Sequence, residues 1–140
     1  MVYLDTSAAV PLFVQEPASD SVAAWFAACA EPMVAADWIM TEFASALSLK
    51  ERRGDISAES AGLAWAEFEA FCGTGLRLVP VRRKSFEEAA RMVREAASGL
   101  RSGDSLHLAV ALEIGASSMA TADANLDANA RKKGLDIIRF

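Results

Sequence analysis

The chain has 140 residues, of which 53% are apolar and 24% charged. This balance excludes a disordered protein and predicts one compact domain over residues 1–140. No apolar run approaches the ~20 residues that span a bilayer, and Met1–Leu4 lacks the basic flank of a secretory signal, so we expect a cytoplasmic protein without a membrane partner. The net charge of −5 argues against a broadly basic nucleic-acid-binding surface.

Hydrophobic periodicity predicts short strands that alternate with amphipathic helices. We expect the helix at Asp37–Arg53 to end at Gly54. The next helix is expected to be capped by Ser57 and to end at Gly73–Gly75. In chain order the expected elements are a strand at Val2–Leu4, a helix at Ala18–Ala30, a strand at Met33–Ala36, helices at Asp37–Arg53 and Ser57–Phe71, a strand at Leu76–Val81, helices at Ser85–Ser98 and Asp104–Ile114, a strand at Ser117–Thr121, a helix at Asp123–Lys133 and a strand at Asp136–Phe140.

Alternating strands and helices favour an α/β fold, with a mainly parallel sheet covered by helices on both faces. In such folds ligands bind beyond the carboxyl ends of the strands. Cys29 and Cys72 lie in apolar helical segments and are expected to be small core side chains. Three basic clusters are typical either of helix ends and solvated faces or of contacts with a substrate backbone; they are Lys50, Arg52 and Arg53; Arg82, Arg83 and Lys84; and Arg131, Lys132 and Lys133.

Three acidic residues stand at expected helix starts. Asp5 follows the first expected strand directly and Asp123 comes just after the fourth, where the crevice rule places ligands, and Asp104 opens a further helix. Taken singly, each is better explained as a helix N-cap. Their shared placement favours a common site, because the carboxyl ends of parallel strands lie at one edge of the sheet.

Glu42 cannot be explained by capping, since it lies in the middle of an expected helix. It falls on the apolar stripe formed by Trp38, Ile39, Phe43, Ala46 and Leu47. A buried carboxylate costs several kcal/mol unless a cation or hydrogen-bond donors meet it. The alternatives are a salt bridge to a core arginine or lysine, or a metal ion. No basic residue has an evident core position, which favours the metal.

His107 is the only histidine, so it cannot build a zinc site. It is interpreted either as a packed polar residue or as a group that bonds a carboxylate or lines the crevice. Neither cysteine has a context that would activate it as a nucleophile, and no nucleophile elbow or phosphate-binding glycine loop is present. Hard carboxylate oxygens select Mg²⁺ or Mn²⁺, and such ions suit phosphodiester hydrolysis by water.

Four segments resemble the acidic motifs of PIN-domain ribonucleases, with VapC toxins as the most similar group. They occur in order along the whole chain: Val2–Ala8, Thr41–Leu47, Gly103–Ala109 and Thr121–Asp123. The resemblance implies a three-layer α/β/α fold with about five strands in the order 3-2-1-4-5.

The same resemblance implies an Mg²⁺- or Mn²⁺-dependent endoribonuclease that cuts structured RNA. Such enzymes are usually dimeric and are silenced by a cognate antitoxin. Carried over to this sequence, the catalytic, metal-binding acids are Asp5, Glu42, Asp104 and Asp123, with Ser7 and Thr121 as hydroxyls near the pocket. Some relatives have a further acid after the fourth; here position 125 is Asn125 and the next acid is Asp127.

Two other functions remain as alternatives. A receiver-like signalling module requires an acceptor Asp after the third strand, where this chain has Arg82 and Arg83. A metal-dependent phosphatase of the haloacid dehalogenase type requires an Asp at position 7, which is Ser7.

The apolar side chains of two helices suggest a surface for the antitoxin. Val22, Trp25 and Phe26 lie on one helix, and Trp38 and Ile39 on another. They either pack inside the protein or receive an amphipathic helix of the partner, from which an arginine would reach the carboxylates.

Overall fold

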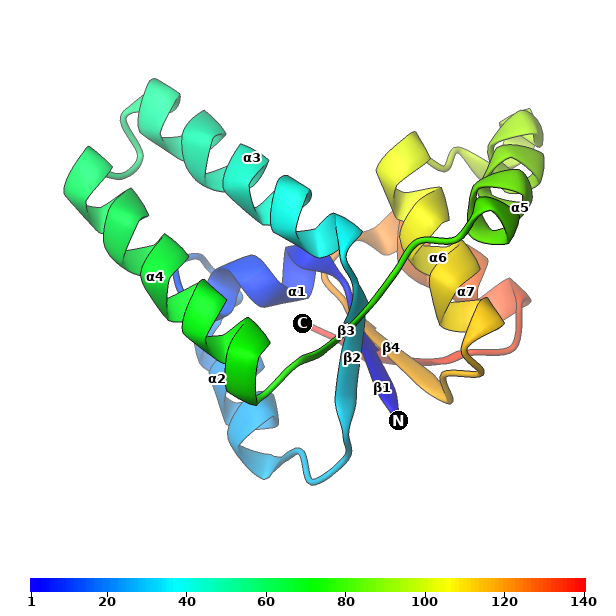
Figure 1. The fold of residues 1–140 in the computed structure, drawn as a ribbon, viewed down its shortest axis with the longest axis horizontal. Helices are drawn as coiled ribbons and strands as arrows, with labels where there is room; N and C mark the ends of the chain where they lie inside the picture. The colour runs from blue at the N-terminus through cyan, green and yellow to red at the C-terminus, as the bar shows by residue number, and fades with distance from the viewer.

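A five-stranded parallel sheet forms the centre of the protein in the computed structural model, which describes residues 1–140 (Figure 1). The strands are β1 (Val2–Leu4), β2 (Met33–Ala36), β3 (Arg77–Val79), β4 (Ser118–Thr121) and β5 (Asp136–Arg139). The helices are α1 (Thr6–Ala9), α2 (Ser19–Ala28), α3 (Trp38–Arg53), α4 (Ala58–Thr74), α5 (Arg83–Arg94), α6 (Ser102–Glu113) and α7 (Ala124–Lys132), with 3₁₀ turns at Val10–Leu12 and Ala96–Ser98.

The strand order is β3-β2-β1-β4-β5, and all neighbouring strands are parallel. This arrangement confirms the predicted α/β/α fold and its strand order. It also differs from the 2-1-3-4-5 order of receiver-like folds, which removes the structural basis of that alternative.

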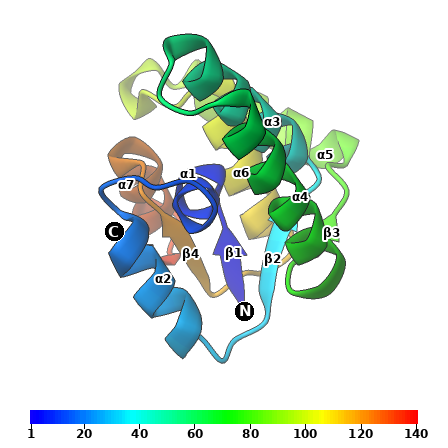
Figure 2. The same ribbon diagram turned by 90° about the vertical axis from the view of Figure 1, so that its left-hand side faces the viewer.

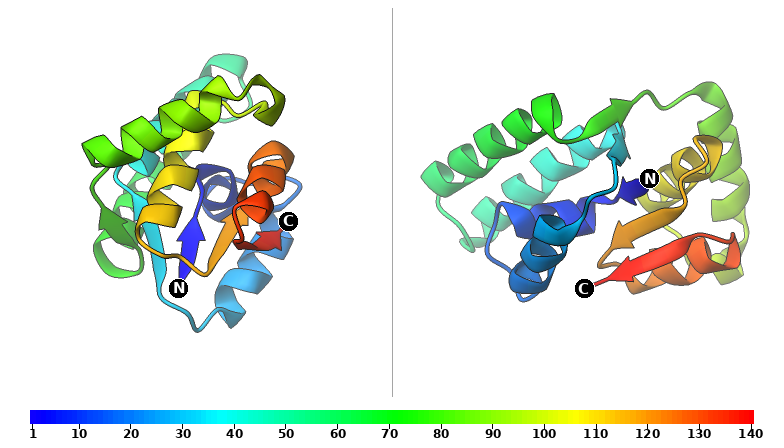
Figure 3. Two further views of the ribbon diagram at one scale, coloured as in Figure 1. Left: turned by 90° about the vertical axis from the view of Figure 1, so that its right-hand side faces the viewer. Right: turned by 90° about the horizontal axis from the view of Figure 1, so that it is seen from below.

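Side-chain alternation along the strands divides the core into two layers. Tyr3 of β1 faces α5, α6 and α7, and Figure 3 shows these helices on that side of the sheet. Val2 and Leu4 face the opposite way, toward α1, α3 and α4 (Figure 2). Because both faces are covered, the central strands β1 and β2 consist of Val-Tyr-Leu and Met-Val-Ala-Ala, whereas the edge strands β3 and β5 also contain charged residues.

Helices α3 and α4 form a hairpin that extends beyond the sheet (Figures 1 and 2). Gly54 ends α3 in the left-handed conformation with φ 78°, and Ser57 caps α4 by accepting from the N–H of Ser60, both as predicted. Phe43 and Phe68 stack between the two helices, with ring centroids 3.9 Å apart. This aromatic packing fixes the helix that carries Glu42.

Several element boundaries differ from those predicted. The strand β3 covers three residues rather than Leu76–Val81, because this edge strand pairs only with β2 and Pro80 follows it directly. Helix α4 continues through Gly73 to Thr74 and ends at Gly75. Helix α5 starts before Ser85 and stops at Arg94, and a 3₁₀ turn follows.

Helix α6 begins at Ser102, so Asp104 is not its N-cap. The position before the helix is Arg101, and Asp104 lies within the first turn. Capping therefore does not explain this acid, although the positive end of the helix dipole still favours a carboxylate there.

The two cysteines and the aromatic side chains of α2 pack against other apolar groups of the protein. Cys29 and Cys72 are free, half-buried thiols that pack against the core layer on the α3 and α4 side. Trp25 contacts Phe140 and Phe26 contacts Phe71, so the aromatic side chains of α2 have partners within the protein. No helix has the length and apolar character needed to cross a membrane.

Candidate metal centre

All four predicted acids line one open cleft of about 640 Å³ at the carboxyl edge of the sheet. Asp5 follows β1, Asp123 follows β4, Glu42 comes from α3 and Asp104 from α6. Two cations, Lys50 and Arg101, and four apolar side chains, Val10, Ala46, Leu49 and Ala122, line other parts of the cleft. The sheet topology thus gathers carboxylates from four separate segments.

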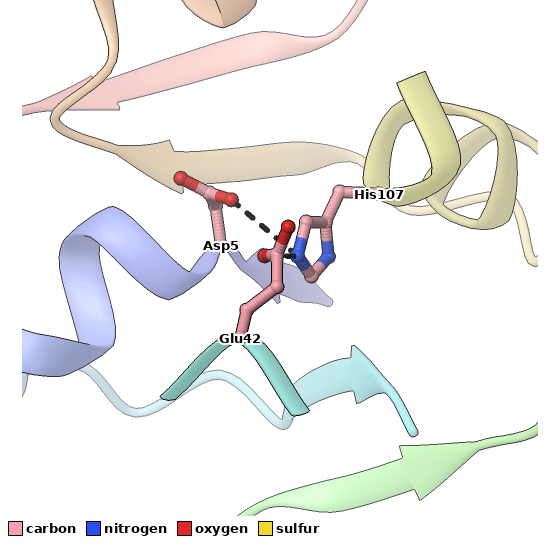
Figure 4. A group of neighbouring side chains, drawn as sticks. All are labelled: Asp5, Glu42 and His107. Carbon is pink, nitrogen blue, oxygen red and sulfur yellow. Dashed lines mark hydrogen bonds and ion pairs between the residues drawn. The ribbon is translucent and has the colours of Figure 1, made fainter. Parts of the chain in front are cut away.

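Asp5 is buried and held by hydroxyl groups. Its side chain is 3% exposed, and Oδ2 accepts from the Ser7 N–H at 3.2 Å, the Ser7 hydroxyl at 2.5 Å and the Thr121 hydroxyl at 3.0 Å. Asp5 is therefore the N-cap of α1 as well as a wall of the cleft. Oδ1 lies 3.7 Å from Nε2 of His107 (Figure 4). Ser7 thus holds the carboxylate of Asp5 in place. It cannot supply the second carboxylate that the phosphatase alternative requires at position 7.

Glu42 has neither an arginine nor a lysine partner. Its Oε2 lies 2.6 Å from the hydroxyl of Thr6 and 2.7 Å from Nε2 of His107 (Figure 4). Burial favours a higher pKa for Glu42, but the hydrogen bonds from His107 and Thr6 hold this pKa below its usual value. The carboxylate stays ionised, with its charge directed into the site.

His107 is fully buried and connects the sheet to the cleft. Its Nδ1 lies 2.8 Å from the hydroxyl of Tyr3, which also accepts the N–H of Ala36 at 3.1 Å. Burial opposes a charged imidazole, but the bond to Glu42 and the nearby carboxylates raise the pKa of His107 overall. The geometry agrees with the prediction that His107 is a packed polar residue with its hydrogen bonds satisfied. It also agrees with the prediction that His107 bonds to a carboxylate, which is Glu42.

Asp104 and Asp123 complete the acidic lining. Burial and repulsion from Asp123 and Asp5 raise the pKa of Asp104 to about 6. Asp123 caps α7, since its Oδ1 accepts the N–H groups of Asn125 and Leu126 at 2.8 Å each. Its Oδ2 makes no hydrogen bond to protein. Repulsion among the acids shows that the cleft concentrates negative charge.

Three residues near α7 turn out not to face the cleft. Asn125 bonds through Nδ2 to the carbonyl oxygen of Gly99, and so ties α7 to the loop before α6. Asp127 is buried and paired with Arg131 and Arg139. Thr121 is buried beneath Asp5. Among the predicted pocket-lining residues only Ser7 lines the cleft, because Thr121 and His107 are fully covered.

A model of one protein family matches residues 2–132, almost the whole chain, and its description is PIN domain. The chain belongs to the PIN domain family. A comparison with curated protein sequences found no match. Solved structures with a PIN-like fold are similar at low identity and support the same fold.

Three such structures share nearly the full length of the chain. Mycobacterium tuberculosis VapC20, described as a Sarcin-Ricin loop cleaving toxin, is 18% identical with a TM-score of 0.74 and covers 92% of this chain and 95% of its own. VapBC2 from Rickettsia felis, bound to a promoter DNA fragment, has 16% identity, a TM-score of 0.68 and coverages of 99% and 98%. FitAcB from Neisseria gonorrhoeae has 15% identity, a TM-score of 0.69 and coverages of 99% and 96%. The chain thus shares its fold with these proteins over nearly its full length.

The acidic and histidine groups of this PIN domain can hold a metal ion. Ligand atoms of Asp5, Glu42 and His107 lie within 4.8 Å of one another. Sequence reasoning missed the contributions of Tyr3 and Thr6, which precede and follow Asp5 on the first motif. Two polar side chains in apolar surroundings could have indicated these contacts: the tyrosine of the first strand and the histidine in the run Leu106–Ala111. Both need hydrogen-bond partners when they are buried.

Proposed function

We propose that this PIN domain is a divalent-metal-dependent endoribonuclease and the toxin of a toxin–antitoxin pair. One observation carries the proposal: four carboxylates from separate segments converge in one open cleft, where burial and then repulsion from Asp123 and Asp5 raise the pKa of Asp104 to about 6. Carboxylates gathered at one edge of the sheet repel one another, and a bound cation would relieve this repulsion.

The side chains present fit a hard cation. The cleft acids offer oxygen ligands, which Mg²⁺ and Mn²⁺ prefer, and no thiol lies among them. Asp5, Asp104 and Asp123 would hold the ion, with Glu42 as a further direct or water-mediated ligand. When bound, one or two such ions would acidify a water molecule and neutralise charge on the scissile phosphate.

The protein's own residues have separate tasks in this reaction. Ser7 and Thr121 fix the carboxylate of Asp5, and the N-terminus of α7 fixes that of Asp123. The open cleft admits a polynucleotide, and Lys50 and Arg101 lie where phosphates would pass. Attack of the water oxygen on phosphorus breaks the P–O3′ bond, and a proton passes to the leaving oxygen. The products are 5′-phosphate and 3′-hydroxyl ends.

The toxin assignment rests on the PIN fold together with the kinds of protein that share it. One similar structure is described as a toxin that cleaves the sarcin-ricin loop, and others are the VapBC2 and FitAB complexes bound to DNA fragments. By analogy we propose structured RNA as the substrate, a cognate antitoxin as the partner and a homodimer as the free form.

Cleavage by the purified chain tests the proposal. Structured RNA should be cut with Mg²⁺ or Mn²⁺, and excess chelator should stop cleavage. Asp5→Asn should be inactive while retaining the fold, because the amide oxygen can still accept from Ser7 and Thr121. Sequencing of the cleaved ends should find 5′-phosphates. Undiminished cleavage in chelator, or 2′,3′-cyclic phosphate ends, would show that the mechanism is wrong.

A further inference from the structure

A continuous hydrogen-bond chain runs from the backbone of β2 through two buried side chains to Glu42. The Ala36 N–H donates to the hydroxyl oxygen of Tyr3, Tyr3 contacts Nδ1 of His107, and Nε2 of His107 contacts Oε2 of Glu42. The distances are 3.1, 2.8 and 2.7 Å. Tyr3 and His107 are both fully buried, so no bulk water competes for these bonds.

The chain determines which nitrogen of His107 carries a proton. The hydroxyl oxygen of Tyr3 already accepts an N–H from Ala36, and its own proton has no acceptor within reach other than Nδ1. Tyr3 therefore donates to Nδ1, and the neutral imidazole must carry its proton on Nε2. The other neutral tautomer would place a bare Nε2 against a carboxylate oxygen at 2.7 Å and leave the phenol proton unpaired.

We propose that His107 is a positioning residue, which donates its Nε2–H to Glu42 in a tautomer set by Tyr3 and so fixes the Glu42 carboxylate at the edge of the metal centre. In this arrangement His107 is not itself a metal ligand, because both ring nitrogens are committed to other partners. The proposal deepens the proposed function, on which it rests for the presence of a metal.

The position of the other Glu42 oxygen supports the same conclusion. A Cβ atom built on Gly103 would lie 2.1 Å from Oε1, so this oxygen lies directly against the bare backbone of α6. Thr6 adds a second donor to Oε2 at 2.6 Å. Glu42 is thus held from three sides by Thr6, His107 and the surface of Gly103, and one orientation is left.

The single histidine allows a direct test, because the imidazole nitrogen spectrum of the protein contains the signals of His107 alone. In the metal-free full-length chain, ¹⁵N NMR should show a protonated Nε2 and a bare Nδ1. Tyr3→Phe should shift the Nδ1 signal, because this nitrogen loses its hydrogen-bond donor, and should weaken the preference for the Nε2–H tautomer, which only the contact with Glu42 then supports. A bare Nε2 in the unmodified protein would overturn the proposal, whatever the activity.

Mn²⁺ binding, measured by calorimetry, supplies the second readout. Tyr3→Phe and His107→Phe should each weaken binding by about 10-fold, the usual effect of removing an outer hydrogen bond to a metal site. His107→Gln should restore much of the loss, since its amide nitrogen can donate to Glu42 and its amide oxygen can accept from Tyr3. Ser85→Ala is the matched control, because it removes a buried hydrogen bond, to Glu113 under α5, away from the cleft.

The outcomes separate this inference from the proposed function. Unchanged Mn²⁺ affinity in folded Tyr3→Phe and His107→Phe, beside normal RNA cleavage by the unmodified chain, would overturn the positioning role alone. If both variants lose Mn²⁺ affinity as expected but the unmodified chain does not cleave RNA, the positioning role is supported and the ribonuclease assignment is wrong. Failure of the unmodified chain to bind Mn²⁺ would overturn both.

Discussion

The raised pKa of Asp104 makes the metal-free protein sensitive to pH. Its folded-state pKa is about 6 against an ordinary value of 3.8. Between these values the unfolded chain loses the proton first, so ionisation favours unfolding. The contribution of Asp104 to stability is therefore highest below pH 4, falls as the pH rises through 6 and stays low above it.

Asp104→Asn should accordingly stabilise the metal-free protein at pH 8 by about 1 kcal/mol, a value that allows for solvent screening of a half-buried group. The gain should vanish at about pH 3 and below, where the acid is mostly protonated in both states. Thermal unfolding at the two pH values measures both effects, and added Mg²⁺ should then stabilise the unmodified chain more than the variant. Destabilisation at pH 8 would show that Asp104 has a structural role instead.

Asp127 provides a control of opposite sign. The hydrogen bonds and charges of Arg139 and Arg131 hold its pKa below the ordinary value. Asp127 therefore contributes stability above about pH 4, and this contribution disappears as the pH falls through its folded pKa. Asp127→Asn should lower the melting temperature at pH 7 and change Mg²⁺ binding little, because the side chain faces its two arginines rather than the cleft.

At the scale of the elements, α3 and α6 approach one another at Gly103. A methyl group there would lie 2.1 Å from Oε1 of Glu42 and 3.3 Å from Nε1 of Trp38. Gly103→Ala should displace the Glu42 carboxylate and reduce RNA cleavage by at least about 10-fold. Gly62→Ala on α4 is the matched control, since nothing lies within 4 Å of its Cβ. That variant should keep full activity and gain up to ~1 kcal/mol from helix propensity.

The start of α6 also places a cation in the cleft, which we propose contacts the RNA. Arg101 lines the cleft and makes no ion pair, whereas Lys50 is paired with Glu16. Arg101→Ala should raise the KM for RNA and lower the slope of log affinity against log salt by about 0.7, the value for one contact to single-stranded phosphate. Arg52→Ala is a suitable comparison, because Arg52 bonds to Ser48 outside the cleft. Equal salt slopes for both variants would show that Arg101 does not contact RNA.

At the scale of the whole molecule, we propose that the antitoxin acts at the cleft itself. The aromatic side chains of α2 have partners inside the protein, but Leu49 is exposed beside the acids, with Ala46 and Val10 nearby. A partner helix on this apolar wall would bring an arginine within reach of the carboxylates.

Inhibition by the antitoxin should therefore compete with Mg²⁺. Changing that one arginine or lysine of the partner to alanine should weaken inhibition even where the complex persists. Cleavage assays over a range of Mg²⁺ concentrations measure the competition. Inhibition that is independent of Mg²⁺, by a partner bound on the face remote from Asp5 and Asp104, would show that the antitoxin acts elsewhere.

The sequence by itself determined the elements, the layered sheet and the acids at its edge. Strands and helices follow from the local spacing of apolar residues, and parallel strands necessarily bring Asp5 and Asp123 to the same edge. Glu42 was recognisable because a carboxylate on an apolar stripe requires a partner. These signals are local, and each can be read within a few residues.

Only the tertiary structure decided which side chains meet. Glu42 and His107 are 65 positions apart, and Tyr3 and His107 are 104 apart, so their contacts depend on how α3 and α6 pack across β1. Helix α6 starts at Ser102, so Asp104 lies inside the helix and not at its N-cap position as expected. No local capping side chain marks this start. A lone buried histidine can satisfy its hydrogen bonds in several ways, and the partner is chosen by packing between distant segments rather than by its neighbours in the chain.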